Sequence, residues 1–515
     1  MTEGQERLLE FLHDGSAYGL PGTEVETITT HAAAIFLVGD RAYKMKRAVR
    51  YSFLDFTQLA ARKAALEAEL HLNRRTAPML YRRLVPVTDE GQGRLALDAA
   101  GEPVEWLLEM RRFDQDALLD RLAERGDLDA RLIDRLAREI AAFHDRAEVR
   151  PDRGGLAGMR QVIEGNREDF SQLVGEVLPQ AAIAELNQRA RAELERRAEL
   201  LECRREDGKV RHCHGDLHLG NIVLLDGTPV LFDCLEFDEA LASTDTFYDL
   251  AFLVMDLLHR RLDPLAERLL TGYLDVTWDD PGTALLPLFL SCRAAIRAKV
   301  VGFGARSADS ASERAAALEA ARDYLERALG FLAPAPPRLI AIGGVSGTGK
   351  STLARALAPS VGAAPGAVVL RSDVVRKKLF GKTPEERLGA DAYREEVTQN
   401  VYETLGTRAL TLLRAGQAAI VDAVFLRPDE RAAVERLASE IEVPFQGLWL
   451  SAPTNVLERR IAERRTDASD ATAEVLRRQL SVDPGAITWS RLDASGAPDR
   501  ILEAARIALA EAPGG

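Results

Sequence analysis

Two short stretches of this 515-residue sequence combine residue types that suit phosphate chemistry. In the first, residues 214–221 read His-Gly-Asp-Leu-His-Leu-Gly-Asn, and Asp233 follows twelve residues after Asn221. The carboxylate of Asp216 can orient an attacking hydroxyl, while Asn221 and Asp233 offer the hard oxygen ligands that magnesium prefers. A strand-like run and an Asp-Gly turn between the last two would fold both back onto one metal ion. The spacing predicts a phosphoryl-transfer site, against the alternative of a chance polar loop.

The second stretch is rich in glycine and follows the pattern G-x4-G-K-S over residues 344–351. Glycines let backbone N–H groups face phosphate oxygens, Lys350 can reach the β- and γ-phosphates, and Ser351 can ligate magnesium. An apolar run before the pattern and a helical run after it provide the context that a phosphate-binding loop needs. The residues expected to cradle a nucleotide are Gly344, Val345, Ser346, Gly347, Thr348, Gly349, Lys350, Ser351 and Thr352.

Strand-like runs after this loop end in carboxylates. Asp373 follows one such run and Asp422 closes another, and open α/β sheets gather their ligand groups at such strand ends. Asp422 is therefore a candidate to hold magnesium, directly or through water. Arginines on a mobile segment over the phosphates would stabilise charge during transfer. Arg464 is the first candidate and Arg460 the second, with a solvated helix face as the alternative.

The elements that must position these groups differ between the two parts of the chain. Residues 33–38 and 41–47 read as strands joined by a Gly-Asp turn, and residues 104–110 read as a further strand. Helical spacing dominates the segments 59–75, 114–146 and 159–205. We therefore expect a small lobe rich in strands and then a larger helical lobe. After residue 337, short apolar runs alternate with helical ones, which is typical of a doubly wound parallel sheet.

A proline-rich stretch marks the predicted domain boundary. Three of the five residues at 333–337 are proline, which ends a helix and favours an extended linker. We expect an N-terminal domain over residues 1–332, with a small lobe to about residue 110 and a helical lobe over 111–332. The C-terminal domain is expected over residues 338–515.

The first constellation resembles the aminoglycoside phosphotransferase family, a branch of the α+β protein-kinase-like fold that includes choline and sugar kinases. The resemblance covers residues 33–332 and is most specific over 214–249. It implies that Asp216 is the catalytic base and that Asn221 and Asp233 bind magnesium. It also implies a strand lysine on the ATP phosphates, which we assign to Lys44 with Lys46 as the alternative.

The same resemblance implies a helix glutamate that holds this lysine. Glu69 is our candidate, with Glu67 second. Residues Glu109, Met110 and Arg111 resemble the hinge whose backbone would hold adenine. No glycine-rich loop precedes the lysine, so anchoring of the phosphates by such a loop is not expected.

The C-terminal part, from residue 338 to about 510, resembles small P-loop kinases: polynucleotide 5′-kinases, gluconate kinases and zeta-toxin-like kinases. This resemblance implies an α/β P-loop NTPase fold that binds ATP and Mg²⁺. It also implies that Asp373 activates the acceptor hydroxyl and that Arg376, about one helical turn later, positions it.

Composition narrows the class of protein. Lys and Arg number 67 against 80 Asp and Glu, a formal charge of −13, which argues against broad binding to nucleic-acid backbone. Four cysteines are too few for an extracellular disulfide scaffold. The first residues do not resemble a secretory signal, and no apolar run approaches the roughly 18 residues of a membrane span. We expect a cytoplasmic protein.

Zinc is not expected, because the His and Cys residues near 203–218 match no common site spacing.

The leading hypothesis is a bifunctional ATP-dependent phosphotransferase with two separate nucleotide sites. One alternative makes one domain a regulatory nucleotide-binding module without turnover. Another makes the C-terminal domain an RNA or DNA 5′-end kinase, although no aromatic platform for stacking bases is visible. For the N-terminal acceptor, a cluster of carboxylates after Asp233 favours a cationic, hydroxyl-rich molecule such as an aminoglycoside or amino sugar. Its members, which could instead cap helices or brace the catalytic loop, are Glu236, Asp238, Glu239, Asp245 and Asp249. The oligomeric state is left open.

Overall fold

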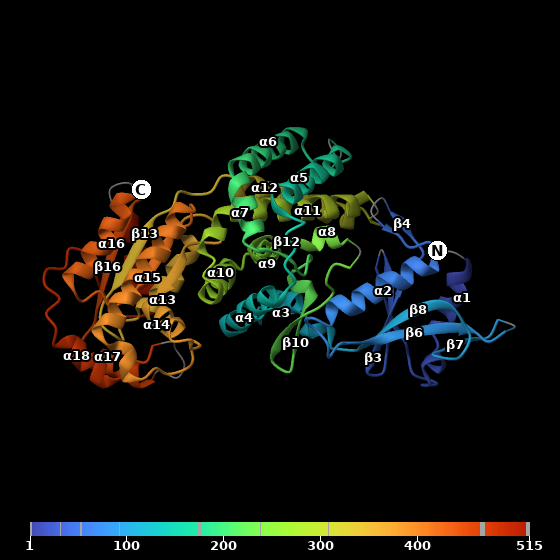
Figure 1. Ribbon diagram of the computed structural model, residues 1–515, viewed down its shortest axis with the longest axis horizontal. Helices are drawn as coiled ribbons and strands as arrows, with labels where there is room; N and C mark the ends of the chain where they lie inside the picture. The colour runs from blue at the N-terminus through green and yellow to red at the C-terminus, as the bar shows by residue number, and fades with distance from the viewer. Residues whose placement is uncertain are drawn as a thin grey trace. The chain divides into compact units, whose positions relative to one another are not determined.

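The chain divides into two compact units (Figure 1). Unit 1 contains the residues up to Asp129 together with Phe143–Gly158 and Cys203–Asp249, and unit 2 contains Ala130–Ala142, Met159–Glu202 and the chain from Leu250 onward. The proline-rich stretch 333–337 thus lies inside unit 2. This computed structural model describes residues 3–510 except His31, Ser52, Phe53, Gln92, Val174, Glu176, Phe237, Ser307, Asp309 and residues 464–468.

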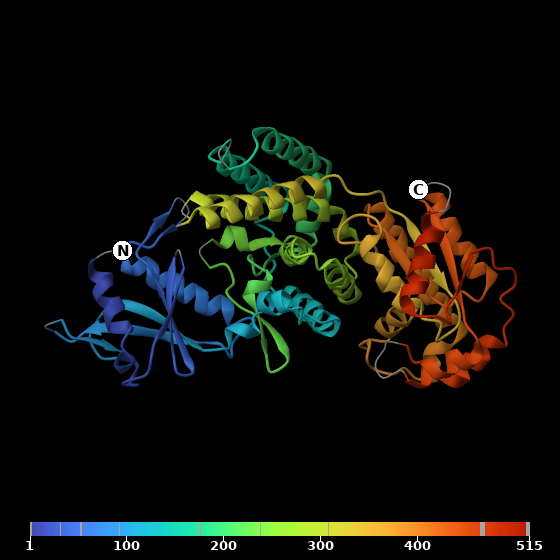
Figure 2. The same cartoon turned by 180° about the vertical axis from the view of Figure 1, so that it is seen from behind.

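Unit 1 is built on a six-stranded antiparallel sheet with the strand order β1-β2-β3-β8-β6-β7. Strands β2 and β3 confirm the predicted pair, and Gly39 in their turn has a φ of 56°, in the left-handed region that such turns use. Helix α2 packs against β8 and β6. Figure 2 shows α1 beside the sheet, where Leu8 and Leu12 pack with Phe36 and Met45. The bounds are α1 (Glu3–Leu12), β1 (Glu26–Thr29), β2 (Ala33–Val38), β3 (Arg41–Lys46), β4 (Arg50–Tyr51), β5 (Leu54–Asp55), α2 (Leu59–Asn73), β6 (Tyr81–Asp89), β7 (Leu95–Leu97) and β8 (Glu102–Arg111).

A β-hairpin and short helices complete unit 1. Strands β10 and β11 are antiparallel, and their turn residues Asp226 and Gly227 both have positive φ, as in a type I′ hairpin turn. This hairpin confirms the predicted strand–turn–strand between Asn221 and Asp233. The bounds are α3 (Leu119–Arg125), β9 (Val210–His212), β10 (Ile222–Leu225), β11 (Thr228–Leu231), α8 (Glu239–Ala242) and β12 (Ser243–Asp245).

The helices between residues 130 and 331 include the long pair α11 and α12, which pack on each other. Helix α12 begins with a capping box in which Ser310 and Glu313 satisfy each other's backbone N–H groups. Among the described residues, no helix is long and apolar enough to cross a membrane. The bounds are α4 (Ala130–Arg146), α5 (Gly155–Ser171), α6 (Gln180–Arg196), α7 (Ala198–Glu206), α9 (Thr246–His259), α10 (Asp263–Thr277), α11 (Leu286–Arg306) and α12 (Ala311–Phe331).

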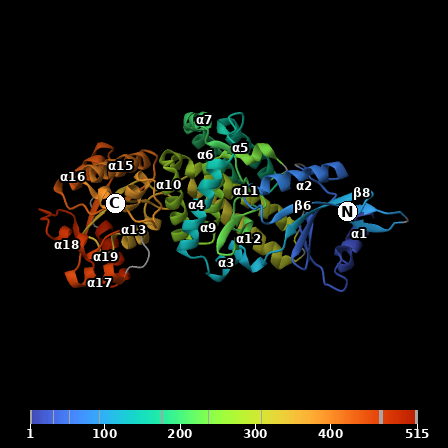
Figure 3. The same cartoon turned by 60° about the horizontal axis from the view of Figure 1, so that its bottom comes forward.

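Unit 2 also contains a five-stranded parallel sheet with the order β14-β15-β13-β16-β17. Helices α13 and α19 lie on one side of it and α15 and α16 on the other (Figure 3), which confirms the predicted doubly wound fold. The bounds are β13 (Leu339–Gly343), α13 (Lys350–Leu357), β14 (Val368–Arg371), α14 (Ser372–Leu379), α15 (Glu395–Arg414), β15 (Ala419–Asp422), α16 (Pro428–Glu440), β16 (Phe445–Ser451), α17 (Thr454–Glu463), α18 (Ala473–Leu480), β17 (Ser490–Asp493) and α19 (Pro498–Ala510).

Helix α10 covers the open edge of this parallel sheet. Strand β14 is an edge strand, and its Val369 N–H donates to Oγ1 of Thr271 on α10 at 3.2 Å. Beside it, Arg408 of α15 makes two hydrogen bonds of 2.8 Å to the buried carboxylate of Asp280. Covering an edge strand removes a template for unwanted strand pairing. Residues before and after the proline-rich stretch therefore share a buried contact.

Candidate active sites

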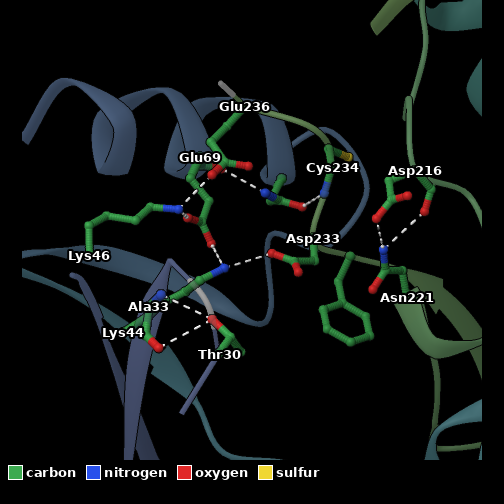
Figure 4. Close-up of polar contacts among 12 residues, drawn as sticks. Thr30, Ala33, Lys44, Lys46, Glu69, Asp216, Asn221, Asp233, Cys234 and Glu236 are labelled. Atoms are coloured by element: carbon green, nitrogen blue, oxygen red, sulfur yellow. Dashed lines mark hydrogen bonds and ion pairs between the residues drawn. The ribbon is translucent and has the colours of Figure 1, made fainter. Parts of the chain in front are cut away.

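Lys44 lies at the centre of the first site. Its Nζ is 2.6 Å from Oε1 of Glu69 on α2 and 2.8 Å from Oδ1 of Asp233 (Figure 4). Lys44 and Glu69 are both buried, and β3 and α2 bring them together across 25 positions of sequence. Burial alone would raise the pKa of Glu69, but the Lys44 and Lys46 ammonium groups outweigh it and lower that pKa. The three residues form the lysine–glutamate–aspartate arrangement that orients ATP phosphates in kinases.

Lys46 forms a second buried ion pair in the same network. Its Nζ is 2.7 Å from the other carboxylate oxygen of Glu69 and 2.5 Å from Oε1 of Glu236. Because β3 residues two apart share a face, both lysines reach Glu69. Lys44 is the lysine that contacts Asp233. Lys46 instead links the chain after Asp233 to the small lobe, through its contact with Glu236. Spacing could not have predicted the contact with Glu236, 190 positions away.

Asp233 is held in an unusual backbone conformation. Its φ of 59° is in the left-handed region, which is costly for a residue other than glycine. Backbone contacts support it: the Asp233 N–H donates to the hydroxyl of Tyr81, and the Cys234 N–H donates to Oδ1 of Asn73. Its side chain remains 40% exposed. The carboxylate is thus aimed by the fold and still accessible to a metal ion.

Asp216 and Asn221 lie together on the predicted catalytic loop. The Asn221 amide donates to the backbone oxygen of Asp216 at 3.0 Å and to its Oδ2 at 2.9 Å. The carboxylate of Asp216 is 41% exposed, so it can meet an incoming hydroxyl. Asn221 therefore fixes the rotamer of the proposed base while its own oxygen stays available for a metal ligand role.

A buried aspartate holds the backbone of the catalytic loop in place. Asp249, at the start of α9, accepts hydrogen bonds from the backbone N–H groups of His214 and Gly215 at 3.2 and 2.8 Å. His144 lies 3.1 Å from the same carboxylate, as a packed structural histidine. His214 in turn donates from Nε2 to the carbonyl of Phe232, next to Asp233. His144, Cys213 and Asp249 are close enough to suggest a metal, but these contacts already account for Asp249 as part of the brace.

The carboxylates expected to attract a cationic acceptor have partners within the fold. Glu236 pairs with Lys46, Glu239 with Arg150 and Asp245 with Arg204, while Asp238 caps α8 and Asp249 braces the loop. The charge argument for a cationic acceptor therefore loses its support.

The predicted adenine hinge also loses support. Glu109, Met110 and Arg111 end β8, where the strand lies between β3 on one side and β6 on the other. The Arg111 N–H donates to the carbonyl of Leu80, and the Glu109 carboxylate pairs with arginines of β6. A strand paired on both sides has no free edge for a base, so we do not retain this contact.

The second site lies between the end of β13 and the start of α13. Gly344, Gly347 and Gly349 have φ of 138°, 87° and 90°, which other residues adopt only with strain. A Cβ on Gly344 would also lie 2.5 Å from the carbonyl oxygen of Leu450. These positions turn the loop 344–352 around the N-terminus of α13. That geometry suits the binding of phosphate by backbone N–H groups.

Two hard oxygen ligands meet at the end of this loop. The hydroxyl of Ser351 is 2.5 Å from Oδ2 of Asp422, and Arg371, paired with Asp422 across β14 and β15, lies 3.5 Å from the same oxygen. Hydroxyl and carboxylate oxygens are the donors that magnesium accepts. The side chains of Ser351 and Asp422 therefore fit this ion, as do Asn221 and Asp233 in the first site.

Asp373 and Arg376 lie on α14, one turn apart. Burial raises the pKa of Asp373, although the nearby Arg371 opposes the shift. Arg376 donates from Nη1 to the carbonyl of Ala392 at 2.6 Å and lies 5.0 Å from the ring of Tyr393. Its buried Nε has no hydrogen-bond partner among the residues that the structure describes. The guanidinium is thus fixed on α14, next to Asp373.

The arginine predicted to cover the phosphates, Arg464, lies outside the described residues. Its runner-up, Arg460, donates to the carbonyls of Ala494 and Gly496 and so serves the fold. Sequence patterns gave no sign of a role for Arg371 and Gln479, whose contacts join separate elements of the C-terminal sheet and helices. Neither residue belongs to a recognisable motif.

Comparisons with known proteins match the two regions of the chain that contain these sites. The model of the Phosphotransferase enzyme family matches residues 60–286, and that of the AAA domain matches residues 339–483. Uncharacterized protein Rv2004c of Mycobacterium tuberculosis is 30% identical over 500 residues, covering 95% of this chain and 96% of that protein. Adenylyl-sulfate kinase of Myxococcus xanthus is 36% identical over 117 residues, 23% of this chain and 59% of that enzyme.

Among solved structures, the choline/ethanolamine kinase family protein from Mesorhizobium loti is similar to 60% of this chain and 92% of its own, with 12% identity and a TM-score of 0.37. The chain joins a kinase-like phosphotransferase fold to a C-terminal P-loop kinase fold with a parallel sheet. It is an ATP-dependent phosphotransferase, and it belongs to the same family as the mycobacterial protein Rv2004c.

Proposed function

We propose that the chain is a bifunctional phosphotransferase in which both sites bind ATP and magnesium and each phosphorylates a hydroxyl of a small molecule. The proposal takes residues 1–332 and 338–515 as the two catalytic domains, in a cytoplasmic protein. Its main support is that each site unites a phosphate-binding lysine with hard oxygen ligands. The observation that carries it is the contact of Lys44 with both Glu69 and Asp233.

In the N-terminal site, Asp216 is the proposed catalytic base. Its exposed carboxylate accepts the hydrogen bond of the acceptor hydroxyl and takes the proton as the phosphoryl group transfers. Asn221 holds this carboxylate in place. Lys44 contacts the ATP phosphates and is itself oriented by Glu69. A magnesium ion held by Asn221 and Asp233 would neutralise phosphate charge.

In the C-terminal site, backbone N–H groups of 344–352 and Lys350 hold the nucleotide phosphates. Asp373 is the proposed base for the second acceptor, and its raised pKa makes it a stronger base than an exposed aspartate. Arg376, one turn after Asp373 on α14, is the proposed residue that positions the acceptor. A magnesium ion held by Ser351 and Asp422 would neutralise charge on the phosphates.

The acceptors are proposed to be small molecules rather than nucleic acid. The relation to an adenylyl-sulfate kinase supports this for the C-terminal site, as does the net charge of −13. An aminoglycoside or amino sugar remains a candidate for the N-terminal site because it carries hydroxyl groups. Its positive charge is no longer an argument for it.

A mass-spectrometric screen of metabolite pools with magnesium and ATP tests this proposal. Wild type should phosphorylate two sets of acceptors, of which Asp216→Asn removes one and Lys350→Ala the other. Asp226→Asn, in the exposed hairpin turn where asparagine tolerates positive φ, is the matched control for the first variant. Lys382→Ala, which removes an exposed lysine paired with Glu386, is the control for the second. Products that survive both active-site variants would refute the assignment of the two sites.

A further inference from the structure

The P-loop contains a hydrogen bond that its phosphate-binding role does not explain. The backbone N–H of Ser346 donates to Oε1 of Gln479 at 2.7 Å. Ser346 lies within the segment 344–352, whose N–H groups are expected to face phosphate oxygens. A carboxamide oxygen is a neutral acceptor with the same hydrogen-bonding role as a phosphate oxygen. Gln479 therefore satisfies a donor that an anion would otherwise satisfy.

Lys350, the lysine of the loop, also donates its hydrogen bonds to oxygens of the protein. Nζ of Lys350 donates to the carbonyls of Gly344 and Val345 at 2.8 and 3.1 Å. Cationic and N–H donors that serve phosphate are thus engaged with oxygens of the protein itself. Binding of a nucleotide must replace these oxygens with phosphate oxygens.

Gln479 reaches the loop from α18, next to the last residue of that helix. Helices α17 and α18 contact each other (Figure 1), and α17 also approaches the loop closely. A Cβ on Gly347 would lie 3.0 Å from the carbonyl oxygen of Leu457 on α17. Both helices therefore contact the first half of the P-loop, and Gln479 makes a polar contact with it.

The segment that carries Gln479 touches the proposed acceptor site at its other end. We name residues 469–480 the bridging segment. Asp470 accepts from the Leu388 N–H at 3.1 Å and from the Tyr393 hydroxyl at 2.9 Å. It also lies 3.3 Å from Nζ of Lys377. Tyr393 is the ring beside Arg376.

We propose that Gln479 is a positioning residue whose carboxamide oxygen holds the Ser346 N–H until a nucleotide phosphate replaces it, so that the bridging segment responds to nucleotide binding. This inference rests on the proposed ATP site of the P-loop. Release of Gln479 frees α18 from the loop, while Asp470 remains tied to the residues around Arg376. Nucleotide binding at the P-loop would thereby change the bridging segment that contacts the residues around Arg376.

The test is calorimetric titration of the full-length protein with magnesium and a non-hydrolysable ATP analogue. The C-terminal site is the one that Lys350→Ala removes. Gln479→Ala removes the internal competitor, so we expect about 2- to 10-fold tighter binding, the value of one ordinary hydrogen bond. Gln479→Glu should weaken binding by about tenfold or more, because a carboxylate bonds the N–H more strongly and repels phosphate. Gln446→Ala, which removes a glutamine bonded to Ser490 in the same domain, is the control.

A ligand series separates this role from a structural one. Adenosine lacks phosphates, so its affinity should be the same in wild type and in both Gln479 variants. Hydrogen exchange of the α18 amides should accelerate when the ATP analogue binds to wild type, and should already be fast in nucleotide-free Gln479→Ala. Weaker ATP binding by Gln479→Ala, equal changes for adenosine, or slower exchange of α18 on binding would each overturn the inference.

The same data distinguish this inference from the proposed function. If Lys350→Ala removes no site, the ATP-binding role of the P-loop is wrong. If Lys350→Ala removes a site and the Gln479 variants bind like wild type, the P-loop role stands and the role of Gln479 is wrong.

Discussion

Replacing Glu267 by glutamine should stabilise unit 2 at neutral and alkaline pH. Glu267 lies in the second turn of α10, is 3% exposed, and accepts a hydrogen bond from Oγ1 of Thr271 at 2.7 Å. Burial raises its pKa from 4.5 to about 7, although the hydrogen bond from Thr271 and the nearby Arg355 and Arg268 oppose this. The folded protein therefore holds this proton more tightly than the unfolded chain does.

The sign and size of the effect follow from proton linkage. Below pH 4.5 both states are protonated and Glu267 costs nothing. As pH rises from 4.5 to 7 the unfolded chain loses the proton first, so the folded state loses stability relative to it. The difference between a pKa of 4.5 in the unfolded chain and about 7 in the folded protein corresponds to about 3 kcal/mol at pH 8 and about 1 kcal/mol at pH 5. Glu267→Gln removes this cost and keeps the acceptor for Thr271.

Urea unfolding at pH 5 and pH 8 measures this difference. Three of the four tryptophans, Trp278, Trp449 and Trp489, lie in unit 2, so fluorescence reports mainly on that unit. The stabilisation by Glu267→Gln should be about 2 kcal/mol larger at pH 8 than at pH 5. Glu319→Gln, an exposed change on α12, should show no such difference. A variant that is no more stable than wild type at pH 8 would refute the reasoning.

Three further predictions concern the two sites. Lys46→Met should destabilise unit 1 by about 3–5 kcal/mol, the cost of breaking a buried ion pair, and Glu236→Gln should recover part of the lost melting temperature when added to it. Asp373→Asn should lower C-terminal transfer about 10²–10⁴-fold with nucleotide affinity nearly intact; transfer at the wild-type rate would exclude Asp373 as the base. Calorimetry with magnesium and an ATP analogue should give two sites per chain, and Lys350→Ala should leave one; a single site that this variant abolishes would remove the N-terminal nucleotide site.

Local sequence patterns predicted much of the secondary structure. The observed β2 spans the predicted residues 33–38, β15 ends at Asp422 as predicted, and β14 ends two residues before Asp373. These elements combine apolar runs with clear turn residues, so the local signal is strong. Strand β6 was missed, because two arginines and Pro86 interrupt its pattern. Its pairing with β8 supplies the stabilisation that its own sequence does not indicate.

Contacts distant in sequence were predicted only where a family pattern pointed to them. Lys44 and Glu69 were paired through the resemblance, and the structure brings them within 2.6 Å. The pairs that join Lys46 to Glu236 and Ser346 to Gln479 have no such pattern, and they depend on folding of the whole unit. The acidic cluster left two interpretations open, a shared cationic ligand or structural roles in helix caps and the loop brace. Adjacent carboxylates suggested one shared ligand, whereas folding gives them separate partners.

The division of the chain into units bears on whether the two sites act independently. Every described contact that builds the first site joins residues of unit 1: Lys44, Glu69, Asp216, Asn221 and Asp233. The P-loop, Asp422 and the bridging segment all lie in unit 2. The described contacts of each proposed nucleotide site therefore lie within one unit, which favours independent binding of two ATP molecules. The C-terminal site also depends on helix α10. This helix belongs to the region matched by the phosphotransferase model, yet it covers the edge strand that leads to Asp373. Substitutions in α10 should therefore lower the activity of the C-terminal site more than the activity of the catalytic loop in unit 1.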